Sequence, residues 1–175
     1  MPIAFLCLLL LGVYHPHIQD DADLVVFHCK EGNCSMKLPA QPTTRTTKTA
    51  KGPTLSYRVT ENGCMYLFSV VEVPEFKAFT PAQIEKRLER GGAMDESASK
   101  ITHSKKITSG DHPGRAVRQE SVDVAKTDGM EVARMHKYIV GTRLYLFVIM
   151  GKKSVVDSDR STRILESLRL EPSQK

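Results

Sequence analysis

The chain has 175 residues, which is enough for one domain with a hydrophobic core and too few for two domains of typical size. Its 41% hydrophobic and 26% charged residues exclude a disordered or fibrous protein. The net charge of +5 suits an anionic partner, but the basic residues form scattered doublets beside acidic residues. This pattern is typical of a solvated surface, so we expect no specific nucleic-acid partner.

The first feature in chain order is an uninterrupted apolar run from Ile3 to Tyr14. The run is too short for a bilayer-spanning helix, which needs ~20 residues, but it fits the apolar core of a signal peptide. We expect residues 1–22 to be a signal peptide or membrane-proximal leader and residues 23–172 to form one domain. The protein would then be exported to the periplasm or cell envelope, with membrane contact only through this segment. The alternative is a buried N-terminal strand or helix in a cytoplasmic protein, because no Lys or Arg precedes the run.

The segments that follow predict strands. Residues 23–29 are rich in β-branched and aromatic residues, and apolar residues alternate with polar ones in residues 34–38. The polar, threonine-rich residues 43–53 indicate an exposed edge strand or a loop. Residues 54–74 contain two β-rich runs around the Asn-Gly pair at residues 62–63, which is the strongest short signal for a hairpin.

The cysteines indicate a cross-strand pair. A tight turn at residues 31–32 would set Cys29 opposite Cys34 with their Cα atoms roughly 4.5 Å apart, at the short end of what a disulfide tolerates. A disulfide between them is therefore feasible. The alternative, a metal site formed by His28 with these two cysteines, has only three ligands and lacks CxxC spacing, so we expect no metal.

A helix start is clearly marked in the middle of the chain. Thr80 is suited to the N-cap, Pro81 to the first helical position, and Gln83 to the partner position of a capping box. Ile84 and Leu88 share one face of this helix, while charged residues occupy the other face. We expect an amphipathic helix that covers a sheet.

The second half of the chain returns to strands before a final helix. Four strands are predicted, at residues 100–108, 114–124, 130–140 and 142–150. The last of these is apolar at every position from Leu144 to Met150, which is typical of a central strand covered on both faces. Residues 157–170 have helical spacing behind a polar start. Strands joined by hairpins, with two main helices packed on them, predict an α+β protein with a twisted antiparallel sheet and not a doubly wound parallel one.

Several segments together resemble small, mostly uncharacterised bacterial proteins with a PsbP-like fold, many of them exported or lipid-anchored. The segments are EGNCSMKLPAQP, YRVTENGCMYLFSVVEVP, HPGRAVRQ, GTRLYLFVIMGKK and ILESLRL. The resemblance covers nearly the whole chain from Asp23 to Leu170. The sequence departs from it at Cys34, where a bulky aromatic residue is favoured, and at Ala116, where an acid often follows the Pro-Gly-Arg sequence.

The resemblance implies a twisted antiparallel sheet between helices. It also implies a place among accessory and binding proteins, a group that includes a photosystem extrinsic subunit and a Ran-binding import factor. No common catalytic residue is implied.

One stretch, GDHPGRAVRQ at residues 110–119, contains an acid, an imidazole and two guanidinium groups. We interpret it as a corner in the chain, because a proline followed by a glycine is turn chemistry and a strand is expected to begin at Arg115. The alternative is a small hydrolase-like enzyme with its site near Asp111, His112 and Arg115. Such a site requires the fold to bring a nucleophile within hydrogen-bond reach of the Asp111–His112 pair.

A second group of polar residues lies in the strand predicted at residues 130–140. Arg134 and His136 share one face of it with Tyr138, because alternate residues of a strand point to the same face. Such a surface can hold an anion, and we name Arg115, Arg134 and His136 as candidate binding residues. The alternative is a polar sheet face beneath a helix or in water.

These patterns predict a non-catalytic binding or accessory module of the cell envelope, with an unknown envelope protein as its partner and without a cofactor. Two alternatives stay open. One is the hydrolase-like enzyme, and the other is a protein that binds an anion, either nucleic acid or acidic lipid, through its excess positive charge.

Overall fold

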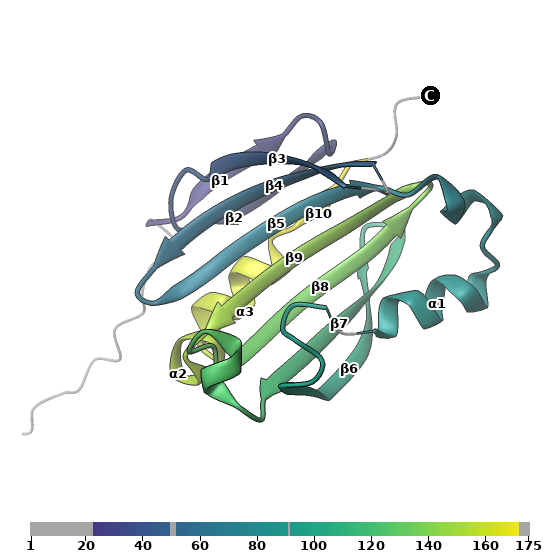
Figure 1. Ribbon diagram of the computed structural model, residues 1–175. Coiled ribbons are helices and arrows are strands. Elements are labelled where there is room, and N and C mark those ends of the chain that lie inside the picture. Colours follow the sequence, from purple (N-terminus) through teal and green to yellow (C-terminus); the bar gives the residue numbers. More distant parts are fainter. Residues whose placement is uncertain (1–22, 50–51, 91, 172–175) are drawn as a thin grey trace, which may run out of the picture.

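Residues 23–49, 52–90 and 92–171 are described in a computed structural model of the protein. Their largest element is a twisted antiparallel sheet of seven strands (Figure 1). In order across the sheet, the strands are β3 (Thr43–Thr49), β4 (Gly52–Glu61), β5 (Cys64–Glu72), β9 (Arg143–Gly151), β8 (Val132–Val140), β7 (His112–Ser121) and β6 (Ser99–Ser109). Neighbouring strands follow one another in sequence except at the pairing of β5 with β9, which joins the two halves of the sheet. The central position of β9 confirms the prediction made from its apolar run.

A second, smaller sheet is formed by β1 (Val25–Cys29), β2 (Cys34–Leu38) and β10 (Arg169–Leu170). The predicted strands β1 and β2 are confirmed, but they do not join the large sheet. β10 pairs with β2 through only two residues, and two residues are too few to show an alternating pattern in the sequence. The small sheet lies across one face of the large sheet, beside the last helix (Figure 1).

Helices cover both faces of the large sheet. α1 (Pro81–Glu89) packs against β7 and β8 on one face, while α2 (Lys153–Val156) and α3 (Asp159–Glu166) lie on the other face (Figure 1). The 3-10 turn η2 (Pro74–Ala78) lies between β5 and α1, and the 3-10 turn η3 (Val124–Thr127) lies between β7 and β8. The chain is therefore the α+β protein with two main helices that the sequence predicts.

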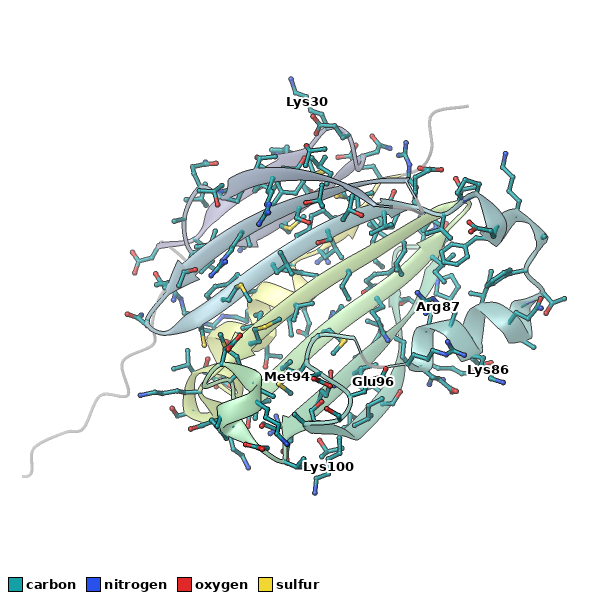
Figure 2. The ribbon with its side chains drawn as sticks, viewed as in Figure 1. Lys30, Lys86, Arg87, Met94, Glu96 and Lys100 are labelled. Atoms are coloured by element: carbon teal, nitrogen blue, oxygen red, sulfur yellow. The ribbon has the colours of Figure 1, made fainter. Side chains whose placement is uncertain are left out.

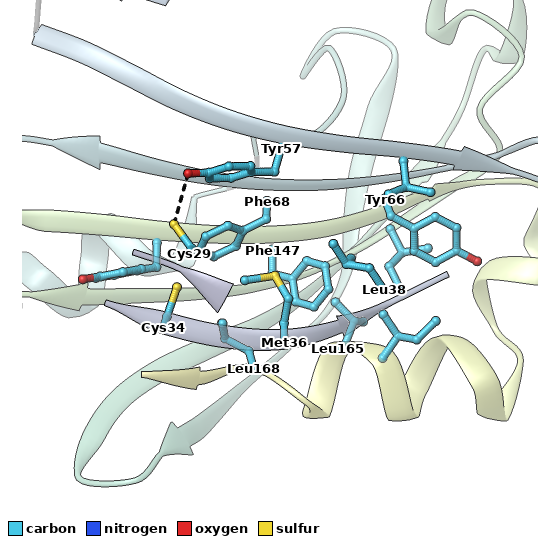
Figure 3. Packing of buried hydrophobic residues seen from close by; sticks show 14 of the residues in the cluster. Cys29, Cys34, Met36, Leu38, Tyr57, Tyr66, Phe68, Phe147, Leu165 and Leu168 are labelled. Carbon is cyan, nitrogen blue, oxygen red and sulfur yellow. Dashed lines mark hydrogen bonds between the residues drawn. The ribbon is translucent and has the colours of Figure 1, made fainter. Parts of the chain in front are cut away.

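The main hydrophobic core lies between the large sheet and the layer formed by the small sheet and α3 (Figure 3). Phe68 of β5 and Phe147 of β9 are completely buried at its centre. Met36 and Leu38 pack on them from β2, and Leu165 from α3. This core explains why the residues of β2, β5 and β9 that face it are apolar.

Two smaller clusters cover the opposite face of the large sheet. Leu88 of α1 packs with Ile139 of β8. Met94 lies in the segment after α1 (Figure 2). It packs with Val117 and Met135. The face is thus closed by α1 and by the chain that follows it.

Two local signals in the sequence are confirmed in detail. The Thr80 hydroxyl accepts the backbone N–H of Gln83, and the Gln83 side chain accepts the backbone N–H of Thr80 at 2.8 Å, which completes the capping box. Asn62 and Gly63 both have left-handed backbone angles, with φ of 51° and 72°, as the tight hairpin between β4 and β5 requires.

The corner within GDHPGRAVRQ lies earlier than predicted. Ser109 pairs with His112, so residues 110–111 form the turn of the β6–β7 hairpin. β7 therefore begins at His112 and not at Arg115. The stretch is a corner, but its turn does not use the proline and glycine.

Gly114 has a packing role instead. A Cβ atom at this position would lie 2.4 Å from Cδ1 of Tyr138 and 2.5 Å from the carbonyl oxygen of Lys137. Only glycine leaves room for the Tyr138 ring to pack against β7. The prediction that Pro113 and Gly114 make the turn is therefore wrong, because the glycine is needed for the packing of Tyr138 from the neighbouring strand.

The predicted leader, residues 1–22, lies outside the described residues, so the signal peptide and the domain boundaries stay predictions. Within the described ranges, no helix has the length and apolar character that crossing a bilayer requires.

Candidate functional site

A cleft of about 310 Å³ separates α3 from strands β6, β7 and β8. We call it the α3 cleft. Its floor is the sheet face that carries Arg134 and His136, and its rim includes Asp157, Thr162 and Glu166 from the α2–α3 segment. The cleft exists because α3 packs mainly on β9 and β2, which leaves the polar end of the sheet only partly covered.

The floor consists of two rows of side chains that cross the three strands. In the first row, His103 pairs with Arg118, and Arg118 pairs with Arg134. A register shift in β6 just before His103 brings this residue into the row.

The second row contains Lys105, Ala116 and His136, again in direct pairing across the strands. Because strands lie about 4.8 Å apart, each row spans roughly 10 Å. Ala116 is the smallest side chain of the floor and lies at its middle, so its size accounts for the open space above it.

The two arginines of the first row have different partners. Arg118 forms ion pairs with Glu120 at 2.7 Å and with Asp157. Arg134 donates from Nη1 to the carbonyl oxygen of Val156 at 3.2 Å and to the hydroxyl of Thr162 at 2.9 Å. Within the described ranges, no carboxylate forms an ion pair with Arg134. Burial lowers the pKa of its guanidinium and the charge of Arg118 acts in the same direction, whereas the carboxylates of Asp157 and Glu166 raise it.

His136 is the most unusual residue of the floor. It is 8% exposed, and its Nδ1 atom is buried without a hydrogen-bond partner. Burial lowers the pKa of its imidazole to about 4, and the charges of Arg134 and Lys105 act in the same direction, while a backbone hydrogen bond with Leu165 opposes them. The ring is therefore neutral at pH 7, and one buried nitrogen lacks the partner that such atoms normally have.

A second cavity of about 240 Å³ adjoins the α3 cleft and shares Lys105, His136 and Glu166 with it. It continues along α3 towards Tyr138 and Arg169. The shared residues make His136 part of the wall of both spaces.

The structure brings together two of the three candidate binding residues. Arg134 and His136 lie side by side in the α3 cleft, as the alternation of β8 predicts. Arg115 does not join them, because it lies on the opposite face of β7. There it pairs with Glu89 and lies 3.5 Å from Glu85, both on α1.

Sequence reasoning missed the rest of the floor, namely His103, Lys105 and Arg118. The signal that could have found Lys105 is the position of the β6–β7 turn. Once residues 110–111 are assigned to the turn, Lys105 falls opposite Ala116.

The residues of the hydrolase-like alternative do not converge. Asp111 lies in an exposed turn, and His112 and Arg115 are three positions apart on a regular strand, so they point to opposite faces. The nearby hydroxyl of Ser109 donates to the carbonyl of Leu168 at 3.1 Å and accepts the N–H of Leu170 at 3.2 Å. This hydroxyl anchors β10.

The predicted opposition of Cys29 and Cys34 is confirmed by the register of β1 with β2. Both are buried free thiols in this structure, so the disulfide stays a prediction. His28 is exposed on the other face of β1, and the structure does not bring it to the two cysteines.

Comparisons with known proteins support the fold. No model of a known protein family matches the sequence, and no curated protein matches it significantly. Among solved structures, the chain is similar to cyanobacterial PsbP from Synechocystis sp. PCC 6803, with a TM-score of 0.55 and 10% identity over 86% of this chain and 94% of that one. A protein of unknown function from Pseudomonas aeruginosa, PA94, matches with a TM-score of 0.42 and 8% identity over 79% of this chain and 90% of that one. The chain therefore has a PsbP-like fold, and likeness at this level of identity shows the fold alone.

Proposed function

We propose that the protein is a non-catalytic binding module of the cell envelope, an accessory protein that holds an oxyanion in the α3 cleft and works with an envelope protein as its partner. The observation that carries the proposal is the floor of the cleft. Side chains with basic nitrogen atoms surround the small side chain of Ala116 in two rows. A cleft of about 310 Å³ accommodates a phosphate monoester with a small organic body.

The charges of the first row favour an anionic occupant. Arg118 stands directly opposite Arg134, and like charges in direct opposition destabilise a sheet. The carboxylates of Glu120 and Asp157 form direct ion pairs with Arg118, whereas Asp157 and Glu166 act on Arg134 only at longer range. An oxyanion beside Arg134 would supply a countercharge in direct contact, and the planar guanidinium can donate hydrogen bonds to two of its oxygens.

The partly buried floor strengthens such an interaction. Charges interact more strongly where solvent is excluded, and Arg134 lies partly under α3. Oxyanion binding would also give the buried Nδ1 atom of His136 a partner, either a water molecule that donates to the neutral ring or the oxyanion itself once the ring is protonated.

The test is isothermal titration calorimetry of the wild-type protein and Ala116→Leu with phenyl phosphate. The larger side chain fills the middle of the floor and keeps every charged group, so we expect affinity to fall roughly tenfold, which corresponds to about 1.4 kcal/mol. Ala125→Leu, at an exposed position of η3, is the matched control and should bind like the wild type. Equal affinity in all three proteins, or no binding by any of them, would refute the oxyanion site.

The envelope location is tested separately. The predicted leader should be missing from the protein recovered in the envelope fraction, as mass spectrometry of its N-terminus would show. An intact Met1 on protein recovered from the cytoplasm would refute the envelope location. It would not affect the binding proposal, which the calorimetry tests independently.

A further inference from the structure

A second group of reactive side chains lies away from the α3 cleft, at the end of the β1–β2 hairpin. Cys29 and Cys34 face each other there and are 1% and 2% exposed. A Cβ atom on Gly32 would lie 2.9 Å from the sulfur of Cys29 and 3.2 Å from that of Cys34. Both sulfur atoms therefore lie beneath the same residue of the turn, and the absence of a side chain at Gly32 makes room for them.

A chain of hydrogen bonds connects this thiol pair to the surface. The backbone N–H of Gly32 donates to the Cys29 sulfur at 3.2 Å. The Cys29 thiol donates to the hydroxyl oxygen of Tyr57 at 3.4 Å, and the Tyr57 hydroxyl donates to the carboxylate of Glu31 at 3.0 Å. Because Glu31 is exposed, a proton from the buried thiol has a route to solvent.

The two thiols are not equivalent. The hydrogen bond from Cys34 lowers the pKa of Cys29 to about 7, and the hydrogen bonds of Tyr57 and Gly32 add to this effect against the cost of burial. The same sulfur–sulfur contact, together with burial, raises the pKa of Cys34. At neutral pH a large fraction of Cys29 is thiolate, whereas Cys34 keeps its proton.

We propose that Cys29 and Cys34 form a reversible dithiol–disulfide couple in which Cys29 attacks a small peroxide and Cys34 resolves the product. The site is independent of the α3 cleft. A small oxidant is required because both thiols are buried under the turn.

The chemistry balances with hydrogen peroxide as the oxidant. The Cys29 thiolate, whose proton has left through Tyr57, attacks one peroxide oxygen; the O–O bond breaks, and the released hydroxide takes up a proton to become water. The sulfur of Cys34 then attacks the sulfur of the resulting sulfenic acid; the S–O bond breaks, and the hydroxyl leaves with the Cys34 proton as a second water. The thiol pair loses two electrons and the peroxide gains them. An external dithiol reverses the reaction by thiol–disulfide exchange and is itself oxidised to a disulfide.

Cys64 provides an internal control within the same chain. It is fully buried like the pair, but burial raises its pKa above the ordinary value. For Cys29, a pKa of about 7 in place of 9.0 gives ~50-fold more thiolate at pH 7. The weaker nucleophilicity of the low-pKa thiolate reduces this to a roughly sixfold gain in rate.

The first experiment exposes the full chain to hydrogen peroxide at pH 7 and follows each cysteine by peptide mass spectrometry. We expect a Cys29–Cys34 disulfide to form at least about sixfold faster than Cys64 is oxidised. Dithiothreitol should reduce this disulfide again. Cys34→Ser should accumulate a sulfenic acid at Cys29, trapped by dimedone, while Cys64→Ser should behave like the wild type. Oxidation of Cys29 no faster than that of Cys64 would overturn the proposal.

The second experiment tests Tyr57 as a positioning residue. Tyr57→Phe keeps the ring and both thiols but removes the hydroxyl that contacts Cys29. The midpoint of the pH profile of Cys29 oxidation should move upward from about 7, whereas a purely structural role would leave the midpoint unchanged. A wild-type profile with its midpoint near that of an ordinary thiol would also refute the couple, whether or not the variant folds.

Discussion

Neutralising Lys105 tests whether the floor of the α3 cleft binds an oxyanion. Lys105 is exposed and lies beside Ala116 in the second row of the floor. The next residue, Lys106, points to the opposite face of the sheet and pairs with Glu85 at 2.7 Å. Lys105→Gln and Lys106→Gln therefore remove the same charge from adjacent positions of one strand but from opposite faces.

The expected difference follows from the geometry of the sheet. An oxyanion above Ala116 lies roughly 6 Å from the Lys105 ammonium group, since the strands are about 4.8 Å apart. With an effective dielectric constant of about 60 for this exposed group, their attraction is about 1 kcal/mol. Losing it weakens binding roughly fivefold. The Lys106 ammonium group lies beyond the sheet, at about the Debye length of ~10 Å in 0.1 M salt, so Lys106→Gln should bind almost as the wild type does.

The assay is calorimetric titration of both variants with phenyl phosphate at fixed ionic strength. Equal weakening of the two variants would show that only the overall positive charge matters. No weakening in either variant would place the ligand elsewhere. Both results would refute the reasoning.

The remaining predictions concern stability. Between pH 7 and pH 5, the unfolding free energy of the wild type, measured with denaturant, should fall by about 2 kcal/mol, whereas that of His136→Gln should not show this fall. The reason is that the pKa of His136 is about 4 in the folded protein and an ordinary 6.5 in the unfolded chain, so the unfolded chain takes up the proton first. Gly114→Ala should lower the unfolding free energy by about 1–3 kcal/mol and the melting temperature by several degrees, because its Cβ would meet the Tyr138 ring; an unchanged melting temperature would contradict that contact. Oxidation of Cys29 and Cys34 should raise the unfolding free energy by about 2 kcal/mol, since it closes a loop of roughly six residues; equal stability of both forms would argue against this.

Features that depend on neighbouring residues could be predicted from the sequence. The capping box at Thr80 and the Asn62-Gly63 hairpin each involve residues within four positions, and the structure confirms both. The central position of β9 could also be predicted, because burial on both faces leaves an unbroken apolar run.

Features that depend on distant residues could not be predicted in the same way. Gly114 suggested a turn, but it is required by Tyr138, which lies on the next strand. β10 is too short to show a pattern and pairs with a strand from the other end of the chain. The pairing of Arg134 with Arg118 follows only from the register of β7 with β8, which a single sequence does not display.

The oxyanion site in the α3 cleft is tested most directly by following the imidazole of His136 and the backbone amide of Ala116 by NMR during a titration with inorganic phosphate. We predict saturable shifts at both residues, with the pKa of His136 rising because a bound anion favours the protonated ring. The amide of Ala125, an exposed residue of η3 that does not line the cleft, should not move. Saturable shifts that leave His136 and Ala116 unchanged, or no saturable shift anywhere, would contradict the account.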